Sequence, residues 1–392
     1  MASRPGQETQ IKKRRQDPRT IPPADRTAPA PLPTGDPYLG AHAVPARCAR
    51  ETSLTELHAP ERARIAHDTS LPKPYAPFPP ADRAAPPADP SSIWTLQDEN
   101  ASISTANLTD RYYVNGLKLG WTSPTGAVPG FLATLGNTLW GDGQQRIGFS
   151  LSQQMYTPAD TQVSVPDPHD RPYAGLLLGN FTLLSDTDTS RSVLMLSLGW
   201  TGPASGAEGL QNGFHNLIGQ NEVNGWSHQI DNTPAVELLS GRTWRLPIAQ
   251  FGGLETDVLP SLTAAVGDVR DYVQVGGTGR LGQGLDSDFG APRLHPGLSG
   301  EDAYVQTRPF AWYLFAGLDG QAVGYDLTLE STPFRGGPHV NIIWDVGEAQ
   351  AGVALLAYGV RLTFTYAVQT QEFDNQHGGL HQFGSAALSV KF

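Results

Sequence analysis

The chain has 392 residues, and its 43 glycines and 33 prolines predict one large β domain with a disordered part rather than several compact domains. The formal net charge of −11 argues against nucleic acid as a partner, because nucleic acid recognition calls for basic surfaces. A transmembrane helix needs about eighteen consecutive apolar residues, which the sequence lacks. A membrane β-barrel remains possible, because its strands alternate apolar and polar residues and an averaged hydropathy does not reveal them.

The first 90 residues are rich in proline. They hold 18 of the 33 prolines, and such a segment has too little apolar material to offset the entropy of ordering. The basic run at residues 12–15 is not followed by the apolar stretch of a secretory signal peptide. The single cysteine, Cys48, excludes an intramolecular disulfide. We therefore predict that residues 1–90 are largely disordered.

From residue 91 onward, stretches of about ten residues alternate in polarity, as tilted membrane-crossing strands do. We place strand starts at residues 92, 111, 144, 172, 190, 233, 253, 268, 308, 321, 343, 360 and 381. A bacterial barrel has an even number of strands, so one start is misread. The region 308–345 is the suspect, because residues 319–321 fit a bulge as well as a turn.

The C-terminal stretch shows the alternation most plainly. Its apolar face comprises Ala386, Leu388, Val390 and Phe392. The apolar sets of two other strands are Leu362, Phe364, Tyr366 and Val368, and Leu117, Leu119 and Trp121. Aromatic residues near strand ends suit interfacial girdles, namely Tyr112, Tyr113, Trp121, Trp200 and Trp312.

A soluble β-sandwich or barrel would alternate similarly, but bulky apolar outward positions in a chain with only 17% charged residues favour lipid. We predict an all-β fold for residues 91–392. It is a transmembrane antiparallel β-barrel of about twelve strands with a short helix in an outer loop.

That helix is predicted within residues 199–229. Ser205 and Glu208 have the spacing of a capping box, and Gly219 suits the left-handed residue that ends a helix. Gln211 and His215 lie four apart and share a face. The adjoining face is an apolar stripe of Leu210, Phe214 and Leu217. A lone histidine is more often an ordinary surface residue, but here it is a proton carrier beside an amide.

Four blocks of the sequence together resemble one family. They are residues 98–121 with RYYVNGLKLGW, 170–181 with DRPYAG, 202–230 with GLQNGFHNLIGQNE, and the closing residues 370–392. The combination resembles the lipid A 3-O-deacylase family, also called LpxR-type, of bacterial outer membranes. The resemblance implies a twelve-stranded barrel that removes the 3-linked acyl chain of lipid A, with calcium involved, at a site on the outer-leaflet side.

The resemblance also implies roles for individual residues. His215 matches the family's catalytic histidine, Gln211 its partner one turn earlier, and Asn100 the asparagine of an Asn-Asp pair in the site. Arg171 matches an arginine near the phosphorylated sugar. We add Lys118, on the inner face of its strand, as a second cation for the anionic substrate.

Three positions depart from the family pattern. Ala101 replaces the expected Asp, Val114 a Thr, and Asn221 a Glu. Calcium takes six to eight oxygens, carboxylates among them, so we expect calcium dependence to be absent or weak. Replacement ligands would come from the candidates Asp98, Glu99, Asp110, Asn221 and Glu222.

Ester hydrolysis needs an activated water or nucleophile, a proton carrier and donors for the developing oxyanion. The sequence has no Gly-x-Ser-x-Gly elbow, so we expect His215 to activate a water, with Gln211 and Asn100 as donors. Two functions remain open. One is an outer-membrane hydrolase that acts on lipid A or lipopolysaccharide. The other is a barrel of the same build that binds glycolipid or serves a structural role.

Overall fold

The structure is a computed structural model that describes residues 87–103, 111–295, 302–332 and 336–392, all within one compact unit, Asp68–Phe392. The Pro-rich segment 1–90 lies outside the described residues except for its last four. Its predicted disorder therefore stays a prediction.

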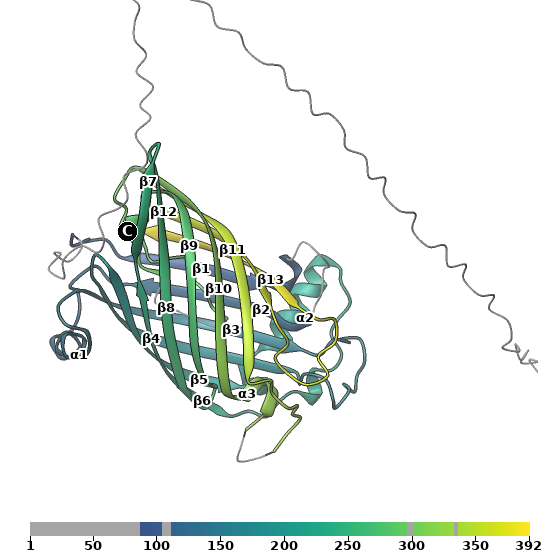
Figure 1. Ribbon diagram of the computed structural model, residues 1–392. Coiled ribbons are helices and arrows are strands. Elements are labelled where there is room, and N and C mark those ends of the chain that lie inside the picture. Colours follow the sequence, from purple (N-terminus) through teal and green to yellow (C-terminus); the bar gives the residue numbers. More distant parts are fainter. Residues whose placement is uncertain (1–86, 104–110, 296–301, 333–335) are drawn as a thin grey trace, which may run out of the picture. The chain divides into compact units, whose positions relative to one another are not determined.

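A closed barrel of twelve antiparallel strands forms the described part of the chain (Figure 1). Each strand pairs with its neighbours in sequence, β1 pairs with β13, and β6 pairs with β8 to close the sheet. The barrel strands are β1 (Ile93–Asn100), β2 (Tyr112–Thr122), β3 (Gln144–Thr157), β4 (Ala174–Asp186), β5 (Ser190–Thr201), β6 (Pro234–Trp244), β8 (Leu254–Gly267), β9 (Arg270–Gln283), β10 (Phe310–Asp326), β11 (Asp345–Ala357), β12 (Val360–Gln369) and β13 (His381–Lys391). A short extra strand, β7 (Leu246–Phe251), pairs with β8 only.

Helices lie at the two ends of the barrel. Figure 1 shows α2 (Ala207–Ile218) and α3 (Leu327–Glu330) at one end, here called the α2 end. The opposite, α1 end carries β7, the last residue of β13 and α1 (Gly130–Trp140). Single 3-10 turns are η1 (Ala101–Ile103), η2 (Gly202–Ser205), η3 (Trp226–His228) and η4 (Leu285–Ser287). No helix among the described residues is both long and apolar enough to cross a membrane.

The predicted alternation holds in the strands. Leu362, Phe364 and Leu388 are exposed on the outer surface, whereas Arg361 and Ser389 are fully buried toward the lumen. Lipid accepts the apolar face, while the polar face finds hydrogen-bond partners inside. The girdle prediction is wrong for Tyr112 and Tyr113, which are buried among protein groups.

A segment between β9 and β10 fills the lumen. We call it the lumen segment; its described residues are 284–295 and 302–309. Asp288 accepts hydrogen bonds from Arg280 Nη1 at 2.7 Å and Tyr313 Oη at 2.9 Å, and Asp302 accepts from Lys118 Nζ at 2.9 Å. Each of these two buried carboxylates thus has a cationic partner. The barrel is a packed body rather than an open tube.

One strand prediction is wrong. The starts at 308 and 321 belong to a single strand, β10, which runs without interruption through residues 319–321. Asp319 faces the polar lumen, where its Oδ1 accepts a hydrogen bond from Gln274 at 2.9 Å. A turn-forming residue is stable in a strand there because its side chain is satisfied. The sequence also hid β7, whose turn uses Gly252 and Gly253 with positive φ.

Candidate active site on the outer face of the barrel wall

Helix α2 begins one residue later than the predicted capping box implies, and that capping box is absent. Ser205 donates a hydrogen bond to the carbonyl of Gly202 at 2.6 Å, and Gly206, in the left-handed conformation, precedes the first helical residue. The predicted end is correct, because Gly219 has a φ of 73° and caps the helix.

The polar face of α2 lies against protein, and its apolar stripe points outward. Gln211 and His215 are buried, whereas Leu210, Phe214 and Leu217 are 43%, 53% and 82% exposed. A surface helix of a water-soluble protein has the opposite arrangement, with its apolar stripe against the core and its polar face outward. It suits a helix whose outer side meets an apolar environment.

The inner face of α2 packs on the outer surface of β2, β3 and β4. An apolar group that we call the wall cluster joins them, with members Val114, Met155, Tyr173, Ala207, Val223 and Trp226. Gly175 of β4 allows the close approach, because a Cβ there would collide with Ser205 Oγ and Ala207 Cβ. Gln153, at an outward position of β3, donates from Nε2 to the carbonyl of Ser205 at 2.7 Å.

His215 is held by the backbone that follows the helix. Its Nδ1 lies 2.7 Å from the backbone oxygen of Asn221. A carbonyl oxygen only accepts hydrogen bonds, so Nδ1 carries the proton in the neutral ring and the basic lone pair lies on Nε2. The contact thereby sets the tautomer that a general base needs.

Gln211 is fixed by a tryptophan of the same loop. Trp226 donates from Nε1 to Gln211 Oε1 at 2.7 Å, and its ring packs on Tyr173 with centroids 5.0 Å apart. Because the amide oxygen takes the indole proton, the Nε2 hydrogens of Gln211 are its donors on the other side. Asn212 braces the loop through two bonds to the backbone of Val223, at 2.8 and 3.2 Å.

Asn100 lies at the last position of β1, on the same wall. It pairs in register with Asn115 of β2, which follows Val114 of the wall cluster. Its Oδ1 accepts a hydrogen bond from the backbone N–H of Ser102 at 2.7 Å. Asn100 thus lies on the strand next to β2, the strand that contributes Val114 to the wall cluster.

Arg171 and Lys118 lie elsewhere, each fully buried against a carboxylate. Arg171 Nη1 donates to Glu372 Oε2 at 2.6 Å and Nη2 to Thr328 Oγ1 at 2.7 Å. Lys118 faces the lumen and pairs with Asp302. The predicted roles of both cations in substrate binding stay predictions, and the ion pairs indicate that both also brace the barrel.

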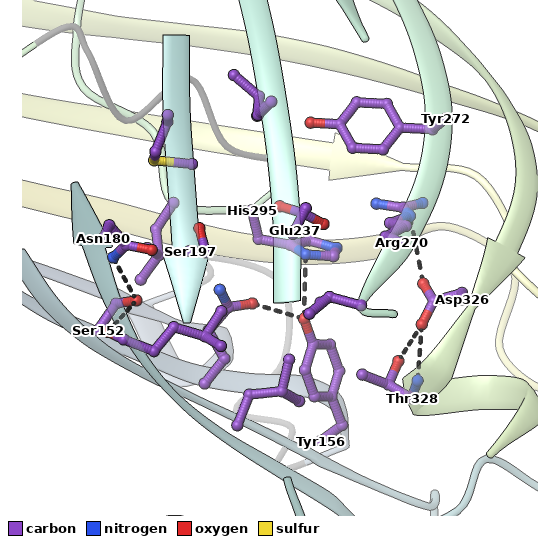
Figure 2. Close-up of a pocket in the computed structure, with 17 residues that line it drawn as sticks. Ser152, Tyr156, Asn180, Ser197, Glu237, Arg270, Tyr272, His295, Asp326 and Thr328 are labelled. Carbon is purple, nitrogen blue, oxygen red and sulfur yellow. Dashed lines mark hydrogen bonds and ion pairs between the residues drawn. The ribbon is translucent and has the colours of Figure 1, made fainter. Parts of the chain in front are cut away.

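The α2 end of the lumen contains a pocket of about 60 Å³ (Figure 2). Figure 2 shows Tyr156 Oη against His295 Nδ1, 3.2 Å apart, and Arg270 beside Asp326, with Nε and Oδ2 3.3 Å apart. None of the site residues predicted from the sequence lines this pocket. Its room suits a few water molecules among polar side chains, so the candidate site is the contact between α2 and the wall.

Comparison with known proteins agrees with this architecture. The sequence profile of a family described as "Outer membrane protein LpxR" matches residues 71–392. The chain belongs to the LpxR family of outer membrane proteins. LpxR from Salmonella typhimurium has a similar structure, with a TM-score of 0.64 at 20% sequence identity over 77% of this chain and 100% of that one. That likeness shows the twelve-stranded LpxR barrel fold, and the protein is located in the bacterial outer membrane.

Some other outer-membrane barrel proteins are similar only at a low level. The translocator domain of the autotransporter NalP from Neisseria meningitidis matches with a TM-score of 0.32 and 10% identity, over 77% of this chain and 87% of that one. A search of curated proteins finds no match in sequence.

Calcium, which the resemblance to the LpxR family implies, does not fit the described residues. Ala101 is fully buried and has no side-chain oxygen. Glu99 faces the lumen, on the opposite side of β1 from Asn100, where Tyr113 Oη and the backbone N–H groups of Leu294 and His295 donate to it at 2.9–3.0 Å.

Two other candidate ligands accept hydrogen bonds from asparagine side chains. Glu222 Oε1 accepts a hydrogen bond from Asn216 at 2.9 Å, and Asp98 Oδ1 accepts one from Asn115 at 2.6 Å. Within the described ranges, no three or more His, Cys, Asp or Glu side chains are grouped to hold a metal. Asp110 lies outside those ranges.

Sequence reasoning missed Trp226, Asn212 and Gln153. Gln153 carried a signal, because a glutamine at the outward position of a lipid-facing strand predicts a covering element. Trp226 and Asn212 act through contacts 15 and 11 residues away in the chain, respectively. No local pattern indicates such contacts in advance.

Proposed function

We propose that this LpxR-family protein is an outer-membrane hydrolase that removes the 3-linked acyl chain of lipid A, with His215 as general base. One observation carries the proposal. His215 is held at the contact between α2 and the outer face of the barrel wall, with Nδ1 bonded to a carbonyl, so its basic nitrogen is Nε2. A base at that place is next to the membrane, where an amphipathic ester is found.

The chemistry follows from the two ring nitrogens. His215 Nε2 takes a proton from a water molecule, whose oxygen attacks the ester carbonyl carbon. The tetrahedral intermediate collapses as the bond to the sugar oxygen breaks, and the imidazolium returns the proton to that oxygen. The products are a fatty acid and a sugar hydroxyl. Throughout, the Asn221 carbonyl stabilises the protonated ring through Nδ1.

Amide donors would stabilise the oxyanion. The Nε2 hydrogens of Gln211, oriented by Trp226, and the side-chain amide of Asn100 are the candidates on this wall. Losing one such donor costs about 3 kcal/mol in comparable enzymes. Because the donor set of the described residues does not suit calcium, we infer that this chain relies on these amides, and that its turnover is slow.

The surroundings of His215 match an acylated substrate. The apolar stripe of α2 is exposed. Leu198 and Trp200, near the end of strand β5, are exposed as well. Acyl chains would lie along these surfaces while the sugar headgroup reaches the polar rim. Lipid A, or lipopolysaccharide that contains it, supplies both parts.

A second function is favoured by the three positions that depart from the family pattern, where Ala101, Val114 and Asn221 stand in place of Asp, Thr and Glu. In that case the same wall would bind glycolipid, or the barrel would be structural, without hydrolysis. Mass spectrometry of lipid A from cells with and without the protein separates the two. Loss of one 3-linked acyl chain supports the hydrolase, and unchanged lipid A that co-purifies with the barrel supports binding alone.

The sharpest variant is His215→Ala, with His228→Ala as the matched control. His228 is an exposed histidine of the same loop, where Nδ1 lies 3.1 Å from Ser227 Oγ. We expect deacylation to be lost in the first variant and retained in the second. Equal activity in both would refute the role of His215.

A further inference from the structure

Helix α1 lies on the outside of the barrel at the end opposite to α2 (Figure 1). Gln145, at an outward position of β3, holds it by donating from Nε2 to the carbonyl of Ala133 at 3.2 Å and to Asn137 Oδ1. Gly136 permits this approach, because a Cβ there would come within 2.7 Å of Gln145 Oε1. The helix is therefore bound to the outer face of the barrel wall.

On the barrel wall near α1, a residue that the polar–apolar alternation of its strand turns toward lipid is buried. Leu183 of β4 has outward parity, since Leu184 packs in the lumen and the ring of Phe181 contacts that of the outward Phe149. Yet Leu183 is only 2% exposed. Because α1 contacts β4, we infer that this helix takes the place of lipid at Leu183.

The face of α1 that points away from the wall is apolar. Phe131, Leu135 and Leu139 follow one another at a spacing of four and are 74%, 39% and 50% exposed. The helix, with sequence GFLATLGNTLW, contains no charged residue. A stripe of this kind would be unfavourable in water.

Three polar side chains of α1 have hydrogen-bond partners within the protein. Thr134 donates to the carbonyl of Gly130 at 3.0 Å, and Thr138 donates to the carbonyl of Thr134 at 2.8 Å. Asn137 accepts from Gln145. Groups placed in a lipid environment must find their partners internally, because no water is present to replace them.

An aromatic band on the wall leads up to α1. Trp121 stacks with Phe149 at 6.1 Å, and Phe149 contacts Phe181 at 5.0 Å between ring centroids. Such bands mark the boundary between hydrocarbon and headgroups. Leu183, under α1, comes two residues after Phe181. The apolar stripe of α1 thus continues the lipid-facing belt at the membrane boundary.

We propose that α1 is an in-plane membrane anchor, whose Phe131, Leu135 and Leu139 insert among the acyl chains of the lipid leaflet at the α1 end. The alternative occupant, a second copy of the chain, fits less well. A stable dimer buries about 800 Å² on each partner, more than three side chains of an eleven-residue helix provide. The proposal rests on the membrane location and is independent of the reaction at His215.

Site-directed spin labelling tests the anchor in the full-length chain. Cys48 is replaced by Ser, and single cysteines are introduced as Phe131→Cys, Leu135→Cys and Leu139→Cys, labelled, and reconstituted into phosphatidylethanolamine–phosphatidylglycerol vesicles. Leu151→Cys, on the lipid-facing side of β3, is the lipid control, and Asp142→Cys, exposed just beyond the helix, is the aqueous control. Heat-modifiable migration confirms that each variant is folded.

We expect labels on all three positions to collide with oxygen and to be shielded from a water-soluble nickel chelate, as at Leu151. Three positions guard against one variant that fails to fold. Nickel accessibility equal to that at Asp142 would overturn the proposal, because the stripe would then lie in water. Shielding from both oxygen and nickel would also overturn it, because protein rather than lipid would then cover the stripe.

Discussion

The Nδ1 atom of His215 lies 2.7 Å from the backbone oxygen of Asn221, six residues further along the chain. The side chain of Asn221, where the family pattern has a carboxylate, takes no part in this contact. The orientation of the histidine therefore depends on the path of the loop rather than on the identity of residue 221.

The first prediction tests that independence. Asn221→Ala should retain deacylation within about twofold, since changes at exposed side chains away from special features cost within about 0.5 kcal/mol. Lipid A deacylation is measured by mass spectrometry for this variant and for His215→Ala. A loss in Asn221→Ala as large as that in His215→Ala would show that the amide side chain, and not the carbonyl, supports the histidine.

The second prediction concerns the indole that orients Gln211. Trp226→Phe keeps a ring against Tyr173 but removes the donor, so Gln211 Oε1 loses its partner at a cost of about 1–3 kcal/mol. We expect roughly a tenfold lower rate with a smaller effect on the apparent affinity for lipid A. Trp344→Phe, at an exposed tryptophan, is the control. Equal rates in the two variants would exclude an orienting role for Trp226.

The third prediction is tolerance of chelation. Apart from the Glu222 carboxylate, which accepts a hydrogen bond from Asn216, the described oxygens near His215 are amides and carbonyls. Calcium affinity follows charge and ligand number, so any binding should be as weak as about 10⁻⁴–10⁻³ M. Deacylation should therefore be unchanged when a chelator holds free calcium in the micromolar range. Complete loss of activity under that condition would show that ligands outside the described residues complete a tight site.

The fourth prediction concerns Glu372, in the loop between β12 and β13. Burial alone would raise the pKa of its carboxyl, but the Arg171 guanidinium, with His295 and Arg270, outweighs burial and holds the pKa well below its usual range. A carboxylate with a lowered pKa contributes stability above its unfolded value, about 4.3, and loses it as the pH falls through the folded value.

Two variants follow from that pair. Arg171→Ala leaves a buried carboxylate without its main partner and should destabilise the barrel by about 3–5 kcal/mol at neutral pH. Glu372→Gln should be less stable than the unchanged protein at neutral pH and lose less stability on acidification. Stability is followed as heat-modifiable migration against urea. Identical acid profiles for Glu372→Gln and the unchanged protein would contradict the assigned pKa.

Much of the barrel was predictable because membrane strands obey a two-residue period. Leu362 and Phe364 alternate with Arg361 and Thr363, and the structure places them on opposite faces as expected. The errors occurred at residues where the two-residue period does not distinguish a strand from a turn. Asp319 and Gly320 have the composition of a turn, but a polar lumen accepts an aspartate as readily as water does.

The candidate site was only partly predictable. Gln211 and His215 share a face at a helical spacing that sequence reveals. That this face turns inward, with Leu210 and Phe214 outward, depends on the solvent around the helix, and lipid reverses the usual rule. The partners of the site, the Asn221 carbonyl and the Trp226 indole, depend on the path of the loop, which no local pattern encodes.

The lumen segment has a consequence for the permeability of the cell envelope. Asp288 and Asp302 tie it to cations on both sides of the barrel, and the lumen pockets beside it hold about 60 and 50 Å³. Spaces of this size among the described residues are too small for a hydrated ion or an antibiotic to pass. We expect planar bilayers containing the protein to show no stepwise conductance, so that a bacterium can carry many copies without becoming leaky.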